Sequence, residues 1–257
     1  MKIGIALSGG GLKGISHLGV IKALYEMGIQ FDCISGCSAG AIVGAFIANG
    51  YSPNETLEII KEIKIQNLLK PSKLRGGILK LNILQDKLLK YLPEDRFESL
   101  KIPLTVNATD IINGKLIGFN SGKLSIPILA SCSVPGLFEP LIYQDKLLID
   151  GGVLCNLPVE PLIDSKCDFI FASHCNPLRP LQSNSPNIRA LIARSLFMSI
   201  HKTSTEKAKI CDFFIEPQEL VAIKRYSFSK IDTIFKMGYE ATMVLEDKIL
   251  EKIAQKS

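Results

Sequence analysis

The sequence lacks the features that place a protein in or across a membrane. It contains no tryptophan, so no tryptophan belt at a lipid interface is expected. No apolar run reaches the ~18 residues that a spanning helix needs. Residues 1–7 are too short for the core of a signal peptide and lead directly into a glycine loop. These absences predict a soluble, cytoplasmic protein whose contact with membranes is at most peripheral.

Metal and disulfide signatures are missing as well. The seven cysteines are an odd number, and they form neither a C-x-x-C pair nor any metal-ligand spacing. We therefore expect reduced thiols, no metal and no cofactor. The formal charge of +5 suits anionic lipids or substrates but is too small to indicate nucleic-acid binding. The sequence gives no indication of oligomeric state.

The N-terminal third alternates between two kinds of element. Residues 2–7 read as a strand, residues 15–27 as a helix, residues 31–35 as a second strand, and a second helix continues to about residue 50. This order predicts an α/β fold: a mostly parallel central sheet flanked by helices in a three-layer sandwich.

The remaining pattern continues this theme without an internal repeat or linker, so we expect residues 1–257 to form a single domain. Predicted helices cover residues 52–65, 82–92, 127–132, 188–210 and 231–254. Predicted strands cover residues 104–110, 115–119, 141–143, 146–149, 168–173 and 213–215, and residues 176–187 read as a surface loop.

A serine stands at the turn between the second strand and its helix. Gly36-Cys37-Ser38-Ala39-Gly40 matches G-x-S-x-G, the turn that lifts a serine hydroxyl above a sheet. Such a sharp reversal brings backbones close together, so its flanking residues must be small. The pentapeptide alone is common, and its neighbours decide its meaning.

A glycine loop, residues 9–14, follows the first strand and opens its helix. Backbone N–H groups at such a place attract negative charge. In one interpretation, two or three glycine amides form an oxyanion hole beside Ser38. In another, Gly9, Gly11 and Gly14 form the G-x-G-x-x-G fingerprint of dinucleotide binding, with Asp32 as its acidic residue, although Asp32 falls at the start of the strand and not at its end. A packing turn without chemistry is the third interpretation.

Two residues compete as the base that would activate Ser38. Asp150 ends a predicted strand and precedes Gly151 and Gly152, which permit an abrupt turn and close approach. An ordinary aspartate is a weak base, and D-G-G alone is also a common hairpin turn. His174 follows a buried strand, and the order Ser38, Asp150, His174 is that of an α/β-hydrolase triad. Both assignments remain open on these observations.

The combination of motifs resembles the patatin-like phospholipase family across roughly residues 2–173. The matching segments are Gly9 to Gly14, Gly36 to Gly40, Ala130 to Pro140, Asp150-Gly151-Gly152, and Asn156 with Pro158.

The resemblance implies a lipid acyl hydrolase with a Ser–Asp dyad, no catalytic histidine and no metal. Ser38 would be the nucleophile and Asp150 the base. Gly10 and Gly11 would donate their amides to the oxyanion. The substrate would be a phospholipid or another acyl-ester lipid.

Other positions would support this site. Gly9 and Ala39 complete the candidate oxyanion hole, and the supporting motif positions are Lys13, Gly14, Gly36, Gly40, Gly151 and Gly152. Cys37 departs mildly from the family pattern, in which another small residue is more usual. Thiol chemistry and simple packing are both conceivable there.

A basic stretch interrupts the middle of the chain. Residues 63–85 contain no acidic residue and interleave lysines and an arginine with leucines and isoleucines. One hypothesis is that this stretch contacts a membrane or forms a lid. The other is that it presents a solvated basic face over core leucines.

Overall fold

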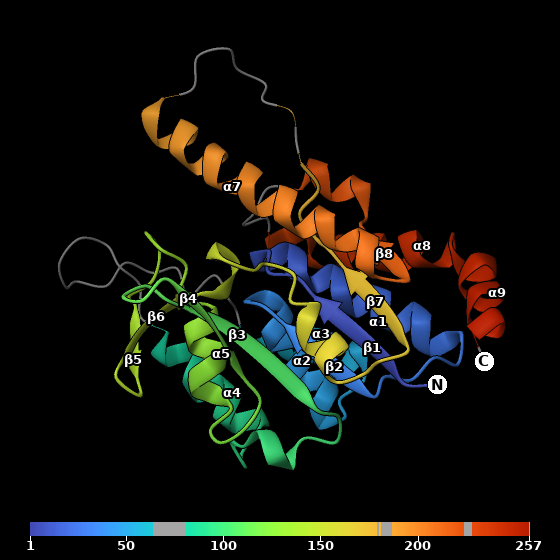
Figure 1. The fold of residues 1–257 in the computed structure, drawn as a ribbon, viewed down its shortest axis with the longest axis horizontal. Coiled ribbons are helices and arrows are strands. Elements are labelled where there is room, and N and C mark those ends of the chain that lie inside the picture. The colour runs from blue at the N-terminus through green and yellow to red at the C-terminus, as the bar shows by residue number, and fades with distance from the viewer. Residues whose placement is uncertain (64–80, 179, 181–186, 224–227, 257) are drawn as a thin grey trace.

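The computed structural model in Figure 1 describes residues 1–63, 81–178, 180, 187–223 and 228–256. Its strands are β1 (Ile3–Leu7), β2 (Cys33–Gly36), β3 (Leu104–Asp110), β4 (Lys115–Phe119), β5 (Leu141–Tyr143), β6 (Lys146–Asp150), β7 (Phe169–Ser173) and β8 (Phe213–Ile215). Its helices are α1 (Ser16–Glu26), α2 (Ala39–Asn49), α3 (Pro53–Ile63), α4 (Asn82–Tyr91), α5 (Ser125–Ser131), α6 (Glu160–Asp164), α7 (Ile188–Glu206), α8 (Ile231–Met243) and α9 (Glu246–Lys256).

The strands form one sheet in the order β5-β6-β3-β2-β1-β7-β8, and β4 also pairs with β3. The pairs along β3-β2-β1-β7-β8 are parallel, whereas β4 and β6 run antiparallel to β3. Leu7 pairs with both Gly36 and Ser173, so β1, β2 and β7 end at the same edge. The predicted mostly parallel sheet is confirmed.

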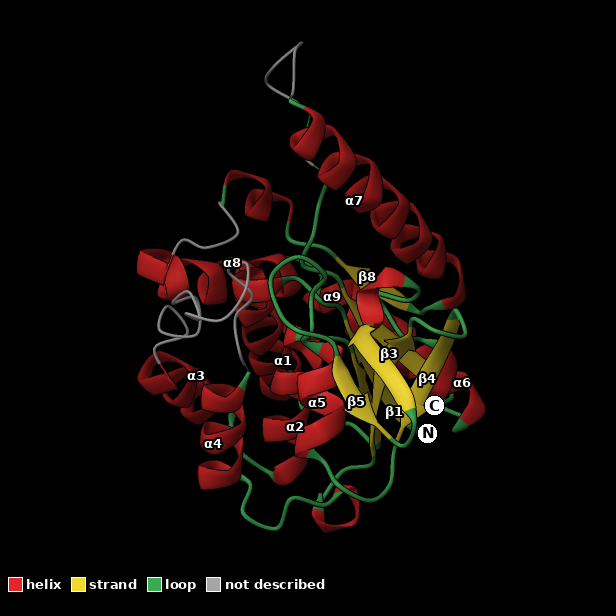
Figure 2. Cartoon of the chain, turned by 90° about the vertical axis from the view of Figure 1, so that its left-hand side faces the viewer, coloured by secondary structure: helices red, strands yellow, loops and turns green. Residues whose placement is uncertain are grey.

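The sheet separates two apolar layers. Because side chains alternate between the faces of a strand, Ile5 and Leu7 join the larger core while Ala6 joins a second core on the other face. Helices α2 and α5 contact the strands that border the larger core, and α6 contacts β1 and β2. Figure 2 shows α1, α2 and α5 together on one side of the sheet, with α6 on the opposite side. The expected layering, helix on sheet on helix, is therefore present.

A close crossing joins the first helix to a late one. A Cβ atom on Gly19 of α1 would lie 2.0 Å from the Phe235 carbonyl oxygen, and one on Gly238 of α8 would lie 2.0 Å from the Ser16 carbonyl oxygen. Because both glycines lack that atom, the two backbones pack directly against each other.

Two predicted helices differ from those observed. The closing helix is two helices, because Leu245 N–H bonds the carbonyl of Thr242, three residues back, where a continuing helix would bond four residues back. Val244 is 83% exposed while Leu245 packs against the core, so the turn redirects the chain toward apolar contacts. Helix α7 ends at Glu206 and continues as a 3-10 turn over Lys207–Ile210.

No helix among the described residues combines the length and apolarity required to cross a bilayer. The basic stretch over residues 63–85 lies mostly outside the described residues, and the lid or membrane hypothesis for it stays a prediction.

Candidate active site

Ser38 occupies a strained turn between β2 and α2. Its backbone lies at φ 51°, ψ −118°, a region that residues with a side chain rarely adopt. Small neighbours make the turn possible: a Cβ on Gly36 would lie 2.5 Å from the Gly40 carbonyl oxygen, and one on Gly40 would lie 2.3 Å from the Leu7 carbonyl oxygen. The G-x-S-x-G pattern therefore meets a steric requirement of the backbone.

Ser131 at the end of α5 holds this turn from the side. The Ser38 N–H donates to Ser131 Oγ at 2.7 Å, and Ser131 is fully buried. Sequence reasoning placed Ser131 in a family-like segment but gave it no role. Its contact with Ser38 joins residues 93 apart in the chain, and no local pattern reveals such a contact.

Asp150 reaches Ser38 through the pairing of β3. The first half of β3 pairs with β2, as Val106 does with Gly36, and its second half pairs with β6, as Ala108 does with Asp150. Asp150 therefore lies two residues beyond the end of β2, level with the serine turn. Asp150 therefore lies at the sheet edge that the sequence predicted for it, although it ends an antiparallel strand.

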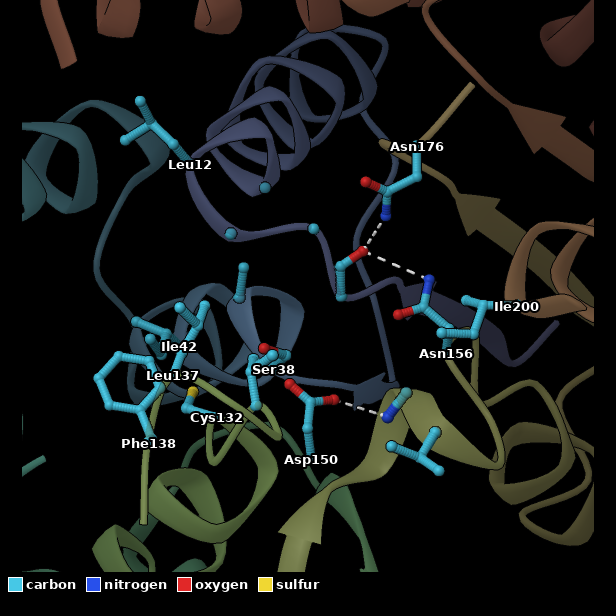
Figure 3. A pocket seen from close by; sticks show the side chains of 18 of the residues that line it. Leu12, Ser38, Ile42, Cys132, Leu137, Phe138, Asp150, Asn156, Asn176 and Ile200 are labelled. Atoms are coloured by element: carbon cyan, nitrogen blue, oxygen red, sulfur yellow. Dashed lines mark hydrogen bonds between the residues drawn. The ribbon is translucent and has the colours of Figure 1, made fainter. Parts of the chain in front are cut away.

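The Asp150 carboxylate is held in place by its neighbours. Oδ1 accepts the Gly152 N–H at 2.7 Å, and the Cys37 thiol donates to the same oxygen at 3.7 Å. The other carboxylate oxygen is turned toward Ser38 (Figure 3). Both Ser38 and Asp150 are only 7% exposed. The structure thus brings the two predicted catalytic residues together in a largely desolvated site.

Cys37 is fully buried behind this pair. Burial raises the pKa of its thiol well above the usual range, and the Asp150 carboxylate raises it further. A neutral thiol is a weak donor and a poor nucleophile. The environment therefore favours packing and hydrogen bonding at Cys37 over thiolate chemistry.

The glycine loop is clamped at its first residue. The Gly9 N–H donates to the Asn156 carbonyl at 3.0 Å, and the Gly9 carbonyl accepts from Asn156 Nδ2 at 3.3 Å and from Asn176 Nδ2. Both amide groups appear beside this carbonyl in Figure 3. The expectation that the Gly9 amide belongs to the oxyanion hole is corrected, because that N–H already has an acceptor.

Three amides remain for an oxyanion. None of the hydrogen bonds within the described residues uses the N–H of Gly10, Gly11 or Ala39, and all three residues line the cavity that contains Ser38. Gly11 has φ 58°, which turns the loop at this point. Gly14 completes the packing, since a Cβ there would lie 2.5 Å from the Ala39 Cβ. Lys13 lies in the turn between Gly11 and Gly14, and its carbonyl oxygen accepts a hydrogen bond from the Ser16 hydroxyl.

Asn176 is the residue that sequence reasoning missed most clearly. It opens the segment predicted as a surface loop, yet it is 5% exposed and its side chain fixes the Gly9 carbonyl. Nothing in the local sequence marks it, because its partner lies 167 positions away.

The structure does not bring His174 to Ser38. His174 Nδ1 lies 2.6 Å from Glu216 Oε1, and the ring packs against Phe214 and His201. Burial lowers its pKa despite the glutamate. His174 is also not among the described residues that line the Ser38 cavity.

His174, His201 and Glu216 are the described residues whose donor atoms lie close enough to consider a cation, within 4.8 Å of one another. The hydrogen bond between His174 and Glu216 already uses the carboxylate. An ion would have to displace it.

Asp32 does not support a dinucleotide site. Its carboxylate accepts the N–H of Ile3 at 2.6 Å, which places it at the beginning of β1 and β2. The glycine loop lies at the opposite end of β1. An acidic residue there cannot reach a ribose whose phosphates rest on that loop.

The site opens into an apolar cavity of about 480 Å³. Ser38, Asp150 and the glycine loop form one part of its wall. Much of the rest comes from α2, from the segment after α5 and from α7, while α3, α4 and Phe228 also contribute. The apolar side chains of this wall include Ile42, Leu137, Phe138, Phe197 and Ile200. Its size is that of a small-ligand pocket. The arrangement can hold an apolar chain with a polar carbon at Ser38.

Sheet, strained serine turn and cavity together define an α/β protein of the nucleophile-elbow class. The chain belongs to the patatin-like phospholipase family, whose family model matches residues 5–163. The resemblance stated from the motifs is thereby confirmed.

Relatives and solved structures agree with this assignment. The chain is 34% identical over 193 residues to an uncharacterized NTE family protein of Mycobacterium tuberculosis, covering 74% of this chain and 54% of that protein. It is 27% identical to a lysophospholipase NTE1 of Mycosarcoma maydis, covering 96% of this chain and 15% of the relative. It thus spans about half of the mycobacterial relative and a small part of the fungal one.

Two of the solved structures that resemble this chain show the shared fold. VipD from Legionella pneumophila superposes with a TM-score of 0.64 at 17% identity, covering 96% of this chain and 67% of that chain. Human GIVD cytosolic phospholipase A2, in complex with a methyl γ-linolenyl fluorophosphonate inhibitor, superposes with a TM-score of 0.57 at 11% identity. This match covers 99% of this chain and 59% of that chain.

Proposed function

We propose that the protein is a serine acyl hydrolase that cleaves carboxyl esters of lipids, with Ser38 as nucleophile and Asp150 as its base. The observation that carries the proposal is the placement of these two side chains, turned toward each other in the wall of an apolar cavity (Figure 3). Phospholipids and lysophospholipids are the substrate classes that the family and the named relatives favour.

Acyl transfer would proceed in two steps. Asp150 takes the Ser38 proton as the hydroxyl oxygen attacks the ester carbonyl, and the amides of Gly10, Gly11 and Ala39 stabilise the oxyanion. Protonated Asp150 then returns the proton to the departing alcohol, which leaves an acyl-Ser38 ester. Water then attacks that ester as Asp150 takes one of its protons. Asp150 returns this proton to the Ser38 oxygen as the bond to the acyl group breaks, so the fatty acid departs and Ser38 is regenerated. All bond changes are accounted for by these residues and water.

The burial of Asp150 supports its role as a base. The carboxylate is only 7% exposed, so little water competes with the Ser38 hydroxyl for it. The Gly152 N–H and the Cys37 thiol both donate to Oδ1, and these contacts fix the direction of the second oxygen. General-base assistance of this kind contributes about 10²–10⁴ in rate.

A fluorophosphonate probe tests the assignment, because it labels an activated serine covalently. We expect labelling of the wild type, none in Ser38→Ala, and a rate reduced by about 10²-fold or more in Asp150→Asn. His174→Ala is the control and should be labelled normally, with folding checked by circular dichroism.

Unlabelled but folded wild type, or labelling that persists in Ser38→Ala, would refute the proposal. Loss of labelling in a folded His174→Ala variant would transfer the role of base to His174. Hydrolysis of defined phospholipids and lysophospholipids then identifies the ester and the chain position.

A further inference from the structure

Helix α7 leaves the body of the protein at its N-terminal end. In Figures 1 and 2 its outer turns extend beyond the sheet and the other helices. Residues 188–198, called here the outer half, include a cluster of exposed large apolar side chains. They are Ile188 (71% exposed), Leu191 (48%), Ile192 (65%), Leu196 (48%) and Met198 (48%).

The inner half of the same helix has a different character. Residues 199–206 are mostly polar, and Ser204 is 2% exposed where the helix meets the body. His201 Nδ1 lies 3.1 Å from the Asn176 carbonyl oxygen, which ties the helix to the residue that holds the glycine loop. The apolar exposure is therefore confined to the projecting turns and is not a property of the whole helix.

The apolar surface of the outer half continues into the cavity. Leu196 is exposed and also lines the cavity, as do Ala193, Phe197 and Ile200 on the same side of the helix. An acyl chain that moved from the tip of α7 toward Ser38 would remain on apolar side chains. This continuity connects the exposed patch to the proposed site of chemistry.

The segment that carries the patch has charged residues of one sign. Residues 169–205 contain no aspartate or glutamate, and α7 has three Arg or Lys residues before Glu206, among them Arg194 and Lys202. A projecting helix with apolar side chains at the tip and cations along its length is the composition of a segment that lies in an anionic lipid interface.

We propose that the outer half of α7 docks the protein on an anionic bilayer, with Ile188, Leu191 and Ile192 seated among the headgroups and upper acyl chains. The charge complementarity and the unbroken apolar path to the cavity select a lipid surface over a second copy of the chain. That the docked helix delivers substrate to Ser38 rests on the function proposed above, whereas docking itself does not.

The absence of tryptophan permits a direct test. In Ile192→Trp the new residue is the only tryptophan of the chain, and Val244→Trp is the matched control, because Val244 is 83% exposed at the turn between α8 and α9. On adding vesicles of phosphatidylcholine with one fifth phosphatidylserine, we expect a blue shift and quenching by bromolipid for Ile192→Trp. Val244→Trp should remain unchanged.

A second comparison measures binding itself. The double variant Ile188→Ser/Ile192→Ser should float with these vesicles about tenfold less than the wild type, and Val244→Ser should float normally. Neither Ile188 nor Ile192 is among the described residues that line the cavity. Hydrolysis of a soluble short-chain ester should therefore be the same in all three proteins.

The outcomes separate the two proposals. Docking is overturned if Ile192→Trp shows no shift with vesicles, or if the double variant floats as well as the wild type. It is also overturned if the tryptophan is buried in a concentration-dependent dimer that ignores vesicles, since the patch would then be a protein interface. Normal docking without fluorophosphonate labelling would refute the proposed hydrolase and leave docking intact.

Discussion

Ser38 has a backbone conformation that costs about 1–3 kcal/mol in a residue with a side chain. The strain is held by contacts from outside the turn, including the hydrogen bond from the Ser38 N–H to Ser131 Oγ. This conformation points the Ser38 side chain into the cavity, above the end of β2. Stability is therefore lost at the residue on which the proposed chemistry depends.

Comparison of two variants isolates this strain. Ser38→Ala and Ser38→Gly both remove the hydroxyl, but only glycine removes the Cβ that disfavours φ 51°. We expect Ser38→Gly to exceed Ser38→Ala in free energy of unfolding by about 1 kcal/mol, measured from urea denaturation at neutral pH. As a control, glycine and alanine are compared at position 41 inside α2, where alanine is the wild-type residue. There Ala41→Gly should have the lower free energy of unfolding. A less stable Ser38→Gly would show that the turn is not strained.

At the scale of elements, the crossing of α1 and α8 positions the glycine loop. Helix α1 follows the 3-10 turn Gly11–Ile15, which belongs to that loop. Its Gly19 packs on α8 while Gly238 of α8 packs on Ser16. A late helix, remote in sequence, thus fixes the direction from which α1 enters the site.

Gly238→Ala tests how tight this crossing is. Helix propensity alone would stabilise the variant by about 1 kcal/mol. The new Cβ would, however, lie 2.0 Å from the Ser16 carbonyl oxygen, so the helices must separate, and overpacking of this kind costs about 1–3 kcal/mol.

We therefore expect a lower midpoint of thermal unfolding for Gly238→Ala. Thr233→Ala, at an exposed position of the same helix, should leave the midpoint equal or higher. A higher midpoint for Gly238→Ala would mean that the crossing can relax without loss.

At the scale of the whole molecule, buried histidines make stability depend on pH. His17 is fully buried between β7 and the loop after β1, with Nδ1 2.7 Å from Ser173 Oγ and Nε2 2.8 Å from the Ser8 carbonyl oxygen. Burial lowers its pKa from 6.5 to about 4, against the opposing effect of the Ser8 hydrogen bond. The pKa of His174 is also lowered, chiefly by burial.

The direction in which the free energy of unfolding changes with pH follows from proton binding. Between pH 6.5 and 4 the unfolded chain takes up a proton at His17 while the folded protein does not, so the free energy of unfolding falls as pH falls. The full effect of His17 is about 3 kcal/mol. Below the folded pKa no further loss comes from this residue.

His17→Gln should reduce this dependence. The variant loses packing at pH 7.5, but the gap to the wild type should narrow on going to pH 4.5, as measured by urea midpoints at both values. His174 keeps part of the slope in both proteins. An equal gap at the two pH values would show that His17 is not held neutral by the fold.

Several features follow from the sequence alone because local backbone geometry demands them. A strand that reverses into a helix at Ser38 requires small residues at Gly36 and Gly40. The pattern can therefore be recognised from five consecutive residues. The alternation of strand and helix likewise specifies a parallel sheet with its loops at one edge. Asp150 followed by two glycines marks a turn, and its order after Ser38 supports the family assignment.

Other features were decided only by tertiary contacts, because the partners lie far apart in the chain. Packing against Glu216 and His201 keeps His174 away from Ser38, and the Asn156 carbonyl takes the Gly9 amide out of the oxyanion hole. Asn176 becomes part of the site through one hydrogen bond across 167 residues. Whether the apolar residues of α7 face a core or the solvent depends on what packs against them. The local sequence carries no signal for this packing.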